Sequence, residues 1–365
     1  MANLRILFIS VFFTPLFPSA QSVKVLTNHI GYEVSKAKHA VVLVDKQTIF
    51  KNGFQLVDEV NGRVAFTGKI IPAGSVNKWK HWLFWTMDFS SFVAEGTYRL
   101  QVSVAGKTFS SFPFIIGKNV LEQSTLSDVI YYFKGQRSSG LLNAADHHLL
   151  LAGKTTDTID AHGGWYDASG DYGKHLSHLS FSSYFNPQQI SLTAWSLLKT
   201  YERLINKSGT DYRQYNRRIL DEAMYGADYL VRMQVPGGSF YRSVSAPGPG
   251  KFAKDRVIRA EDKSYRIKQT KDQSFGGNSG DTAWKSYQVS FRSGGGMAIA
   301  ALAIASMHDT SGDFSNKEYL AAAERAFDFL SKNNAYMTND GKENIVDDYC
   351  ALNAATELYK ATQKD

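Results

Sequence analysis

The first part of the chain alternates apolar and polar positions with the two-residue period of half-buried β-strands. Gly53, Gly62 and Gly106 stand at turns between the apolar runs. Short strands at regular spacing are typical of a two-sheet sandwich. We therefore predict an immunoglobulin-like β-sandwich without the cysteine pair of antibody domains, with strands at residues 41–44, 54–57, 63–66, 98–104 and 112–116.

From about residue 118 the apolar positions recur with the 3.6-residue period of α-helices. Asn186 and Pro187 are residue types of a helix start, and Ser315 with Glu318 has the spacing of a capping box. Residues 294–307 are apolar on nearly every side, which predicts a helix that is buried all round. We expect six helices joined by long irregular loops, with no strands between them, around residues 126–133, 190–205, 219–231, 294–307, 320–330 and 346–362.

The composition indicates a globular protein of two domains, with 365 residues, 43% hydrophobic and 21% charged. The net charge of +7 is spread along the sequence. Its densest basic stretch, residues 251–271, also contains acidic residues, so we predict a solvated loop and no nucleic-acid partner. The single cysteine, Cys350, lies in an apolar helical pattern and is expected to be a buried thiol.

The N-terminus has the pattern of an export signal. Arg5 precedes an apolar run at residues 6–13, and small residues follow up to Ala20. We predict a secretory signal peptide at residues 1–20 and a secreted or periplasmic protein. No other stretch is long and apolar enough to predict a membrane span.

The candidate chemistry lies in the glycine-rich stretch at residues 163–174, which has neither helical nor strand periodicity. Two acids four positions apart, Asp167 and Asp171, could activate and orient a water molecule for attack on a sugar. On spacing alone, such a pair is more typical of a turn or a cation site. Aromatic rings beside the acids offer flat faces on which a sugar ring could stack, and they belong to Trp165, Tyr166 and Tyr172.

Other candidates are weaker. No zinc or haem site is predicted, because the histidines have no Cys or His partner at ligand spacing: His147, His148, His175 and His178. The alternating Asp309, Ser311 and Asp313 lack the glycine and glutamate of a calcium loop, so a turn is expected there. Glu222 and Glu324 are expected on solvated helix faces. Three tryptophans are expected to pack at the sandwich surface or against the next domain: Trp79, Trp82 and Trp85.

The sequence GGWYDASGDYGKH at residues 163–175 closely resembles the catalytic-base loop of glycoside hydrolase family 9. The usual form in that family is GGWYDAGDYGK, so this chain has one inserted residue between the two acids. Further runs resemble the family in the same order, at residues 237–241, 290–303 and 344–352. Residues 25–32 resemble the start of the Ig-like module that many family members carry, so the resemblance covers residues 23–365.

After the signal peptide predicted at residues 1–20, the resemblance implies an Ig-like domain at 22–117 and the N-terminal part of a catalytic (α/α)6 barrel at 118–365. It implies an inverting hydrolase of β-1,4-linked glucan, with a β-linked polysaccharide or oligosaccharide as substrate. Asp171 would be the general base, and Asp167 would help to position the attacking water. No cofactor is required, and calcium occurs in the family at places that cannot be mapped onto this chain.

The sequence also departs from the family. A full barrel needs about twelve helices, and no glutamate matches the motif of the family's general acid, including Glu318, Glu324, Glu343 and Glu357. We expect the chain to be a fragment that lacks the general acid. Two alternatives to a cellulase-like enzyme stay open. The insertion favours an exo-β-glucosaminidase acting on chitosan oligosaccharides, and the missing acid favours a catalytically inactive carbohydrate-binding fragment.

Overall fold

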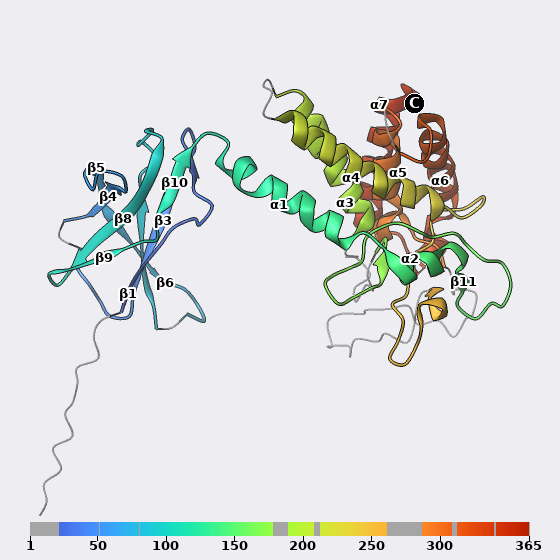
Figure 1. Cartoon of the computed structure of the whole chain (residues 1–365), viewed down its shortest axis with the longest axis horizontal. Coiled ribbons are helices and arrows are strands. Elements are labelled where there is room, and N and C mark those ends of the chain that lie inside the picture. The colour runs from blue at the N-terminus through green and yellow to red at the C-terminus, as the bar shows by residue number, and fades with distance from the viewer. Residues whose placement is uncertain are drawn as a thin grey trace, which may run out of the picture. The chain divides into compact units, whose positions relative to one another are not determined.

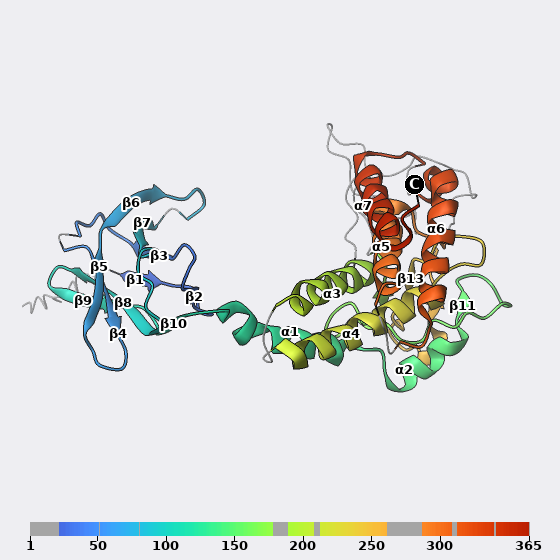
Figure 2. The same ribbon diagram turned by 90° about the horizontal axis from the view of Figure 1, so that it is seen from above.

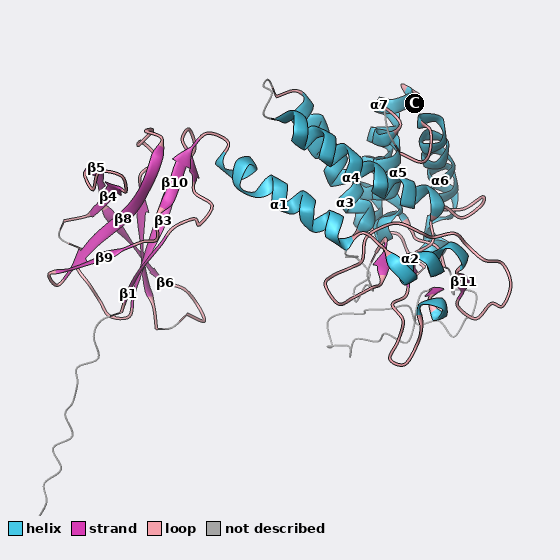
Figure 3. Cartoon of the chain, viewed as in Figure 1, coloured by secondary structure: helices cyan, strands magenta, loops and turns pink. Residues whose placement is uncertain are grey.

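The computed structural model describes residues 22–50, 52–79, 81–177, 189–207, 212–260, 287–308, 312–338 and 341–364. The predicted signal peptide lies outside these residues. The chain divides between Leu126 and Ser127 into two compact units, one of strands and one mainly of helices (Figure 3). The sequence-based prediction of a β domain followed by a helical domain is confirmed.

The first unit is a sandwich of two sheets (Figure 1). One sheet has the strand order β1-β3-β7-β6, and the other has the order β2-β10-β8-β4-β5 with β9 paired to β8. All five predicted strands are present. The strands are β1 Val23–Leu26, β2 Tyr32–Glu33, β3 His39–Val44, β4 Phe54–Asp58, β5 Val64–Gly68, β6 Ile70–Ser75, β7 Leu83–Asp88, β8 Gly96–Val104, β9 Lys107–Ser110 and β10 Phe114–Gly117.

The sandwich core lies between the two sheets and contains side chains from both. Val42 and Met87 come from the first sheet, and Leu56 and Leu100 from the second. Alternate residues of β8 point into this core, as the period-two pattern predicts. Trp85 is buried in it, so the prediction of a surface position is wrong for this residue. Trp85 and Met87, two residues apart on β7, both face the core. The sequence-based prediction treated the three tryptophans as one group and so missed this alternation.

The second unit is organised around the apolar helix α5, which packs against α3, α4, α6 and α7 (Figure 2). Nine of its ten residues are buried, as predicted from its composition. A kinked turn, Phe291–Gly295, in which Gly294 has φ +112°, leads into it. The α-helices of the described residues are α1 Val120–Gln136, α2 Gly140–Ala145, α3 Ile190–Ile205, α4 Arg213–Arg232, α5 Gly296–Ala305, α6 Asn316–Met337 and α7 Ile345–Thr362.

Two of the predicted local features can be compared directly with the structure. Ser315 and Glu318 form the predicted capping box at the start of α6. Cys350 is buried on α7, as predicted. The predicted cap of α3 at Asn186 lies outside the described residues; the helix begins at Ile190, and the preceding Gln189 makes no side-chain capping bond.

A small sheet lies between the helices, so the prediction of no strands there is wrong. Its order is β11-β14-β13-β12, with β11 Leu150–Leu151, β12 Lys174–His175, β13 Ser243–Val244 and β14 Val257–Ile258. Two-residue strands are too short to produce a periodic pattern, which is why the sequence did not reveal them. The sheet nevertheless matters, because β12 ends the loop that carries the candidate acids.

In the described part of the chain, no helix has both the length and the apolarity needed to cross a membrane.

Candidate active site

The glycine-rich loop folds into a tight hairpin that carries both candidate acids. The Asp167 amide donates to the Gly173 carbonyl at 2.9 Å, and the Asp171 amide donates to the Ala168 carbonyl at 3.0 Å. The tip of the hairpin, including Ser169, is exposed. The extra residue between the two acids therefore extends the turn into solvent and leaves the base of the hairpin closed.

The structure brings the two acids together. Asp167, Asp171 and His175 each place one oxygen or nitrogen atom within 4.8 Å of the other two. The Gly173 amide donates to Asp171 Oδ1 at 2.9 Å, and the side-chain amide of Gln189 donates to Asp167 Oδ1. Two half-buried carboxylates at this separation can hold one water molecule or a cation between them. His175 was missed as a member of this group, although it ends the same sequence motif.

A buried lysine at the end of the loop holds the loop in place. Lys174 Nζ lies 2.7 Å from Asp146 Oδ2 and donates to the carbonyls of Ala161 at 2.6 Å and Gly163 at 2.7 Å. Burial lowers the pKa of Lys174 to about 8, although the attraction of Asp146 opposes this effect. Because these bonds join both ends of the loop to one cation, the backbone around the acids has few alternative conformations.

Arg256 completes this buried cluster. Its Nε lies 3.2 Å from Asp146 Oδ1, and its Nη2 donates to the Tyr172 carbonyl at 2.9 Å. Arg256 is only 1% exposed, so the prediction of a solvated basic loop is wrong at this residue. A basic residue in a polar stretch gives no sequence signal of burial, and Asp146 was likewise not singled out.

Trp165 is a packing anchor whose ring also forms part of a pocket wall. The ring is 4% exposed and packs on α4, where a Cβ atom on Gly226 would come within 2.3 Å of it. Gly164, just before the tryptophan, has φ +72°, and a Cβ atom there would lie 2.8 Å from the Tyr229 ring. Both glycines are therefore required for the loop to approach α4 this closely.

A buried carboxylate orients Trp165. The indole Nε1 donates to Glu222 Oε1 at 2.6 Å. Arg137 donates to the same carboxylate from Nε at 3.1 and 3.2 Å and from Nη2 at 2.9 Å. Glu222 is 1% exposed, so the prediction that it lies on a solvated helix face is wrong. The helical pattern alone could not indicate the two partners, which come from distant parts of the sequence.

The two tyrosines of the loop contact each other edge to face, with ring centroids 5.2 Å apart. The Tyr166 hydroxyl accepts from the Ser139 amide at 3.1 Å, which ties the loop to the start of α2. Tyr172 is 47% exposed and presents its ring to solvent. Of the predicted sugar-stacking residues, Tyr172 therefore has the most accessible ring, while Trp165 and Tyr166 also perform structural roles.

A pocket of about 220 Å³ opens beside the hairpin. It is smaller than the 300–1,000 Å³ that is common for ligand sites. Its walls come from α1, the loop and the start of α3, and the lining residues are Tyr132, Phe133, Gln136, Trp165, Tyr166, Asp167, His175, Gln189, Ile190 and Thr193. The pocket thus joins one candidate acid to two of the three candidate aromatic residues, and Tyr172 lies beside it through its contact with Tyr166.

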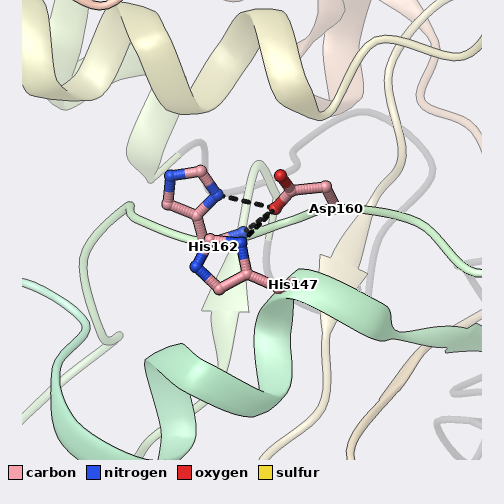
Figure 4. Close-up of side chains that lie close together, drawn as sticks. All are labelled: His147, Asp160 and His162. Atoms are coloured by element: carbon pink, nitrogen blue, oxygen red, sulfur yellow. Dashed lines mark hydrogen bonds and ion pairs between the residues drawn. The ribbon is translucent and has the colours of Figure 1, made fainter.

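Two further sequence-based predictions concern metals. His178, Asp309 and Ser311 lie outside the described residues. Asp313 forms an ion pair with Arg232. His147 has no Cys or His at ligand spacing in the sequence, but the structure places His162 and Asp160 beside it (Figure 4).

Comparison with known proteins identifies both units. Residues 123–365 match the family model for glycosyl hydrolase family 9, and residues 20–107 match that for the cellulase N-terminal Ig-like domain. Endoglucanase D of Acetivibrio thermocellus is 26% identical over an alignment of 231 residues, and the match covers 59% of this chain and 34% of that protein.

Two solved structures share the fold. A metagenome-derived glycoside hydrolase family 9 endoglucanase superposes with a TM-score of 0.61 and 23% identity, covering 94% of this chain and 62% of that one. The protein described as Bacteroides ovatus GH9 superposes with a TM-score of 0.59 and 22% identity, over the same shares of the two chains. The chain thus spans about a third of Endoglucanase D and less than two thirds of either solved chain. Because the catalytic family model covers more than half of its residues, the chain belongs to glycosyl hydrolase family 9.

Proposed function

We propose that this chain is the hydrolytic part of an exported enzyme that cleaves β-1,4-linked glucan by an inverting mechanism. The observation that carries the proposal is the pair of carboxylates, Asp167 and Asp171, within 4.8 Å of each other on one hairpin. Family membership and the similarity to an endoglucanase support the substrate class. The apolar run at residues 6–13 supports export.

In this mechanism Asp171 is the general base that removes a proton from the attacking water. Asp167, whose Oδ1 is oriented by the Gln189 amide, positions that water. The bond that forms joins the water oxygen to the anomeric carbon, and the glycosidic bond breaks on the opposite face of the sugar, where the leaving oxygen takes a proton from the general acid.

The two aspartates cannot themselves be the acid and base of an inverting enzyme. Such a pair stands about 6.5–9.5 Å apart on opposite faces of the sugar, whereas these carboxylates lie within 4.8 Å and belong to one hairpin. They both approach the substrate from the same side. The general acid is therefore a different carboxylic acid, which we assign to no residue of this chain.

The pocket beside the hairpin supports a sugar as the ligand. Aromatic rings favour the apolar faces of pyranoses, and polar side chains at the rim bind hydroxyl groups. Tyr172 supplies an exposed ring, and Tyr166 lies in contact with it. Gln189 and Asp167 supply polar groups at the same pocket.

The test is hydrolysis of soluble β-1,4-glucan by the full-length enzyme that contains this chain and by its Asp171→Asn variant, with Asp157→Asn as the matched control. Asp157 is an exposed aspartate outside the hairpin, and its φ of +66° is one that asparagine adopts readily. Asp171→Asn should lower turnover by about 10²–10⁴-fold, with oligosaccharide binding by calorimetry unchanged. Near-normal turnover of Asp171→Asn would contradict the assignment of the base. Sugar binding without any turnover in the wild type would support the inactive carbohydrate-binding alternative.

The inserted residue in the hairpin favours one alternative substrate, an oligosaccharide of glucosamine. Product analysis separates the two substrate classes. Mixed oligomers released from soluble β-glucan support the endo-acting glucanase, and glucosamine released from chitosan oligosaccharides supports the exo-acting enzyme. N-terminal sequencing of the protein recovered outside the cytoplasm tests export; a chain that still begins at Met1 would contradict cleavage after residue 20.

A further inference from the structure

His175 lies beside the two candidate acids but has no role in the mechanism given so far. It belongs to β12, two residues after Gly173 and four after Asp171. Alternate residues of an extended segment point to the same side. A Cβ atom on Gly173 would lie 2.5 Å from His175 Nε2 and 3.1 Å from Asp171 Oδ1. The imidazole and the carboxylate therefore share the space that Gly173, which has no side chain, leaves between them.

The backbone on both sides of His175 is held in place. Strand β12 pairs with β13, where His175 lies opposite Ser243. The amide of the next residue, Leu176, donates to the Arg242 carbonyl at 3.0 Å, and the preceding residue, Lys174, is fully buried. The position of the imidazole is therefore set by the small sheet and by the buried lysine beside it.

The three side chains are close enough to bind one water molecule together. One atom from each of Asp167, Asp171 and His175 lies within 4.8 Å of the other two. Three points no farther apart than this always have a common point within about 2.8 Å of each (4.8 Å divided by √3), which is close to the usual length of a hydrogen bond to water. Asp167 and His175 also line the pocket of about 220 Å³, and a water molecule takes only about 30 Å³.

The hydrogen-bonding capacities of the three groups differ. An ionised carboxylate only accepts, so Asp167 and Asp171 can bind the two protons of the water but not its oxygen. A neutral imidazole carries one ring N–H in either tautomer, so His175 is the member of this trio that can donate to the oxygen. With both protons and one lone pair engaged, the water keeps one lone pair for bond formation.

We propose that His175 orients the attacking water together with the two aspartates and is a third catalytic side chain of the loop. This inference rests on the proposed hydrolytic function. One water proton passes to Asp171, the other stays in a hydrogen bond to Asp167, and the His175 N–H donates to the water oxygen. The remaining lone pair forms the bond to the anomeric carbon, while the glycosidic bond breaks and the leaving oxygen takes a proton from the general acid. His175 keeps its own proton throughout.

The donor matters because attack requires the lone pair to point at the anomeric carbon. A water held by two acceptors alone can turn about the line that joins them, and the third contact stops this rotation. Misplacement of a reacting atom by about 1 Å can cost about 10²-fold in rate. Loss of the donor should therefore lower kcat, and it should leave KM nearly unchanged because the contacts to the sugar are not altered.

The test uses the full-length enzyme that contains this chain and measures kcat and KM on a soluble β-1,4-glucan. His175→Phe and His175→Ala remove the donor, with and without a ring in its place, and His175→Gln restores an N–H donor. The matched control is His39→Phe, because His39 is an exposed histidine on a strand, β3, of the other unit. Thermal unfolding establishes which variants are folded.

His175→Phe and His175→Ala should each lower kcat by roughly 10²-fold, and His175→Gln should recover about tenfold of that loss. KM should stay close to that of the wild type in all three variants, and His39→Phe should match the wild type in both constants. These results would support the donor role, because a merely structural histidine would not be replaced by glutamine with recovery of kcat alone.

Two results would overturn the inference. One is a wild-type kcat in folded His175→Phe or His175→Ala, and the other is a His175→Gln as slow as the variants without a donor. In either case Asp171→Asn would still lack turnover, so the proposed function would stand. A full-length wild type without any turnover would overturn the proposed function and this inference together.

Discussion

Removal of the Glu222 carboxylate should destabilise the helical unit strongly, because two buried donors lose their acceptor at once. In Glu222→Ala the Trp165 indole N–H, 2.6 Å from the carboxylate, and the Arg137 guanidinium would both lose their partner. Breaking a buried ion pair by removing one member costs about 3–5 kcal/mol. Arg137 is 24% exposed, keeps Asp221 at 3.1 Å and lies 4.2 Å from the centre of the Tyr225 ring. We therefore expect Glu222→Ala to lower the free energy of unfolding by about 3 kcal/mol, the lower end of that range.

The assay is thermal unfolding monitored by calorimetry. For a unit of about 150–250 residues, 1 kcal/mol shifts the melting temperature by roughly 2–4 °C, so Glu222→Ala should melt about 6–12 °C below the wild type. Glu222→Gln should lose less, about 2 kcal/mol, because its amide oxygen can still accept from Trp165.

Glu324→Ala is the matched control, since Glu324 also lies on a helix face but pairs with Lys364 in solvent. Its free energy of unfolding should change by no more than about 0.5 kcal/mol. If Glu222→Ala melts within the range of Glu324→Ala, the carboxylate does not hold Trp165 and Arg137 as the structure indicates. A double-mutant cycle with Arg137→Ala should give a coupling energy of about 1–3 kcal/mol, and strict additivity of the two substitutions would contradict the reasoning.

Three further predictions concern the packing of Trp165, the cap of α6 and the buried Lys174. Gly226→Ala should destabilise the helical unit, because its Cβ atom would lie 2.3 Å from the Trp165 ring. Gly135→Ala has open space at its Cβ position and should be neutral or stabilise the unit by up to about 1 kcal/mol. Chemical denaturation compares the two variants, and equal effects would refute the close packing at Gly226. Ser315→Ala should cost about 1 kcal/mol through loss of the α6 cap, and an unchanged denaturation midpoint would count against that cap. Burial lowers the pKa of Lys174 from 10.5 to about 8. Between pH 8 and 10.5 the unfolded chain therefore binds more protons than the native one, so this group makes the free energy of unfolding rise with pH. The melting temperatures of the wild type and Lys174→Met should change differently with pH across that window, and a parallel pH dependence would contradict the shift.

The elements that could be predicted from the sequence are those whose stability comes from one long periodic face. Helix α5 is apolar on all sides and is buried as expected. The five predicted strands are present because each alternates core and solvent positions over several residues. The capping box of α6 was recognisable because its two residues are three positions apart in the chain. In each case the evidence for the element is local.

The features that could not be predicted depend on partners far apart in the sequence. Glu222 and Glu324 have the same helical setting, and only the arrival of Trp165 and Arg137 makes the first one buried. Arg256 appeared to be one of several basic residues in a polar stretch, but Asp146 pairs with it in the interior. The sequence could specify which residue types are available for pairing, and the fold alone determines which of them meet.

The candidate site depends both on a local motif and on partners that are distant in the sequence. This explains why its two acids could be predicted and the residues that hold its loop could not. Asp167 and Asp171 belong to one short motif, so the sequence alone could pair them. An irregular loop of this composition cannot bury an apolar face, and ordering its backbone costs about 1–2 kcal/mol per residue. In the structure that cost is offset by buried polar contacts, between Lys174 and the Gly163 carbonyl at the two ends of the loop and between Trp165 and Glu222 of α4. The position of the two candidate carboxylates is therefore set largely by the residues that hold the loop, and if the proposed function is right, substitutions at Lys174 and Glu222 should lower activity by displacing the acids even though both remain present.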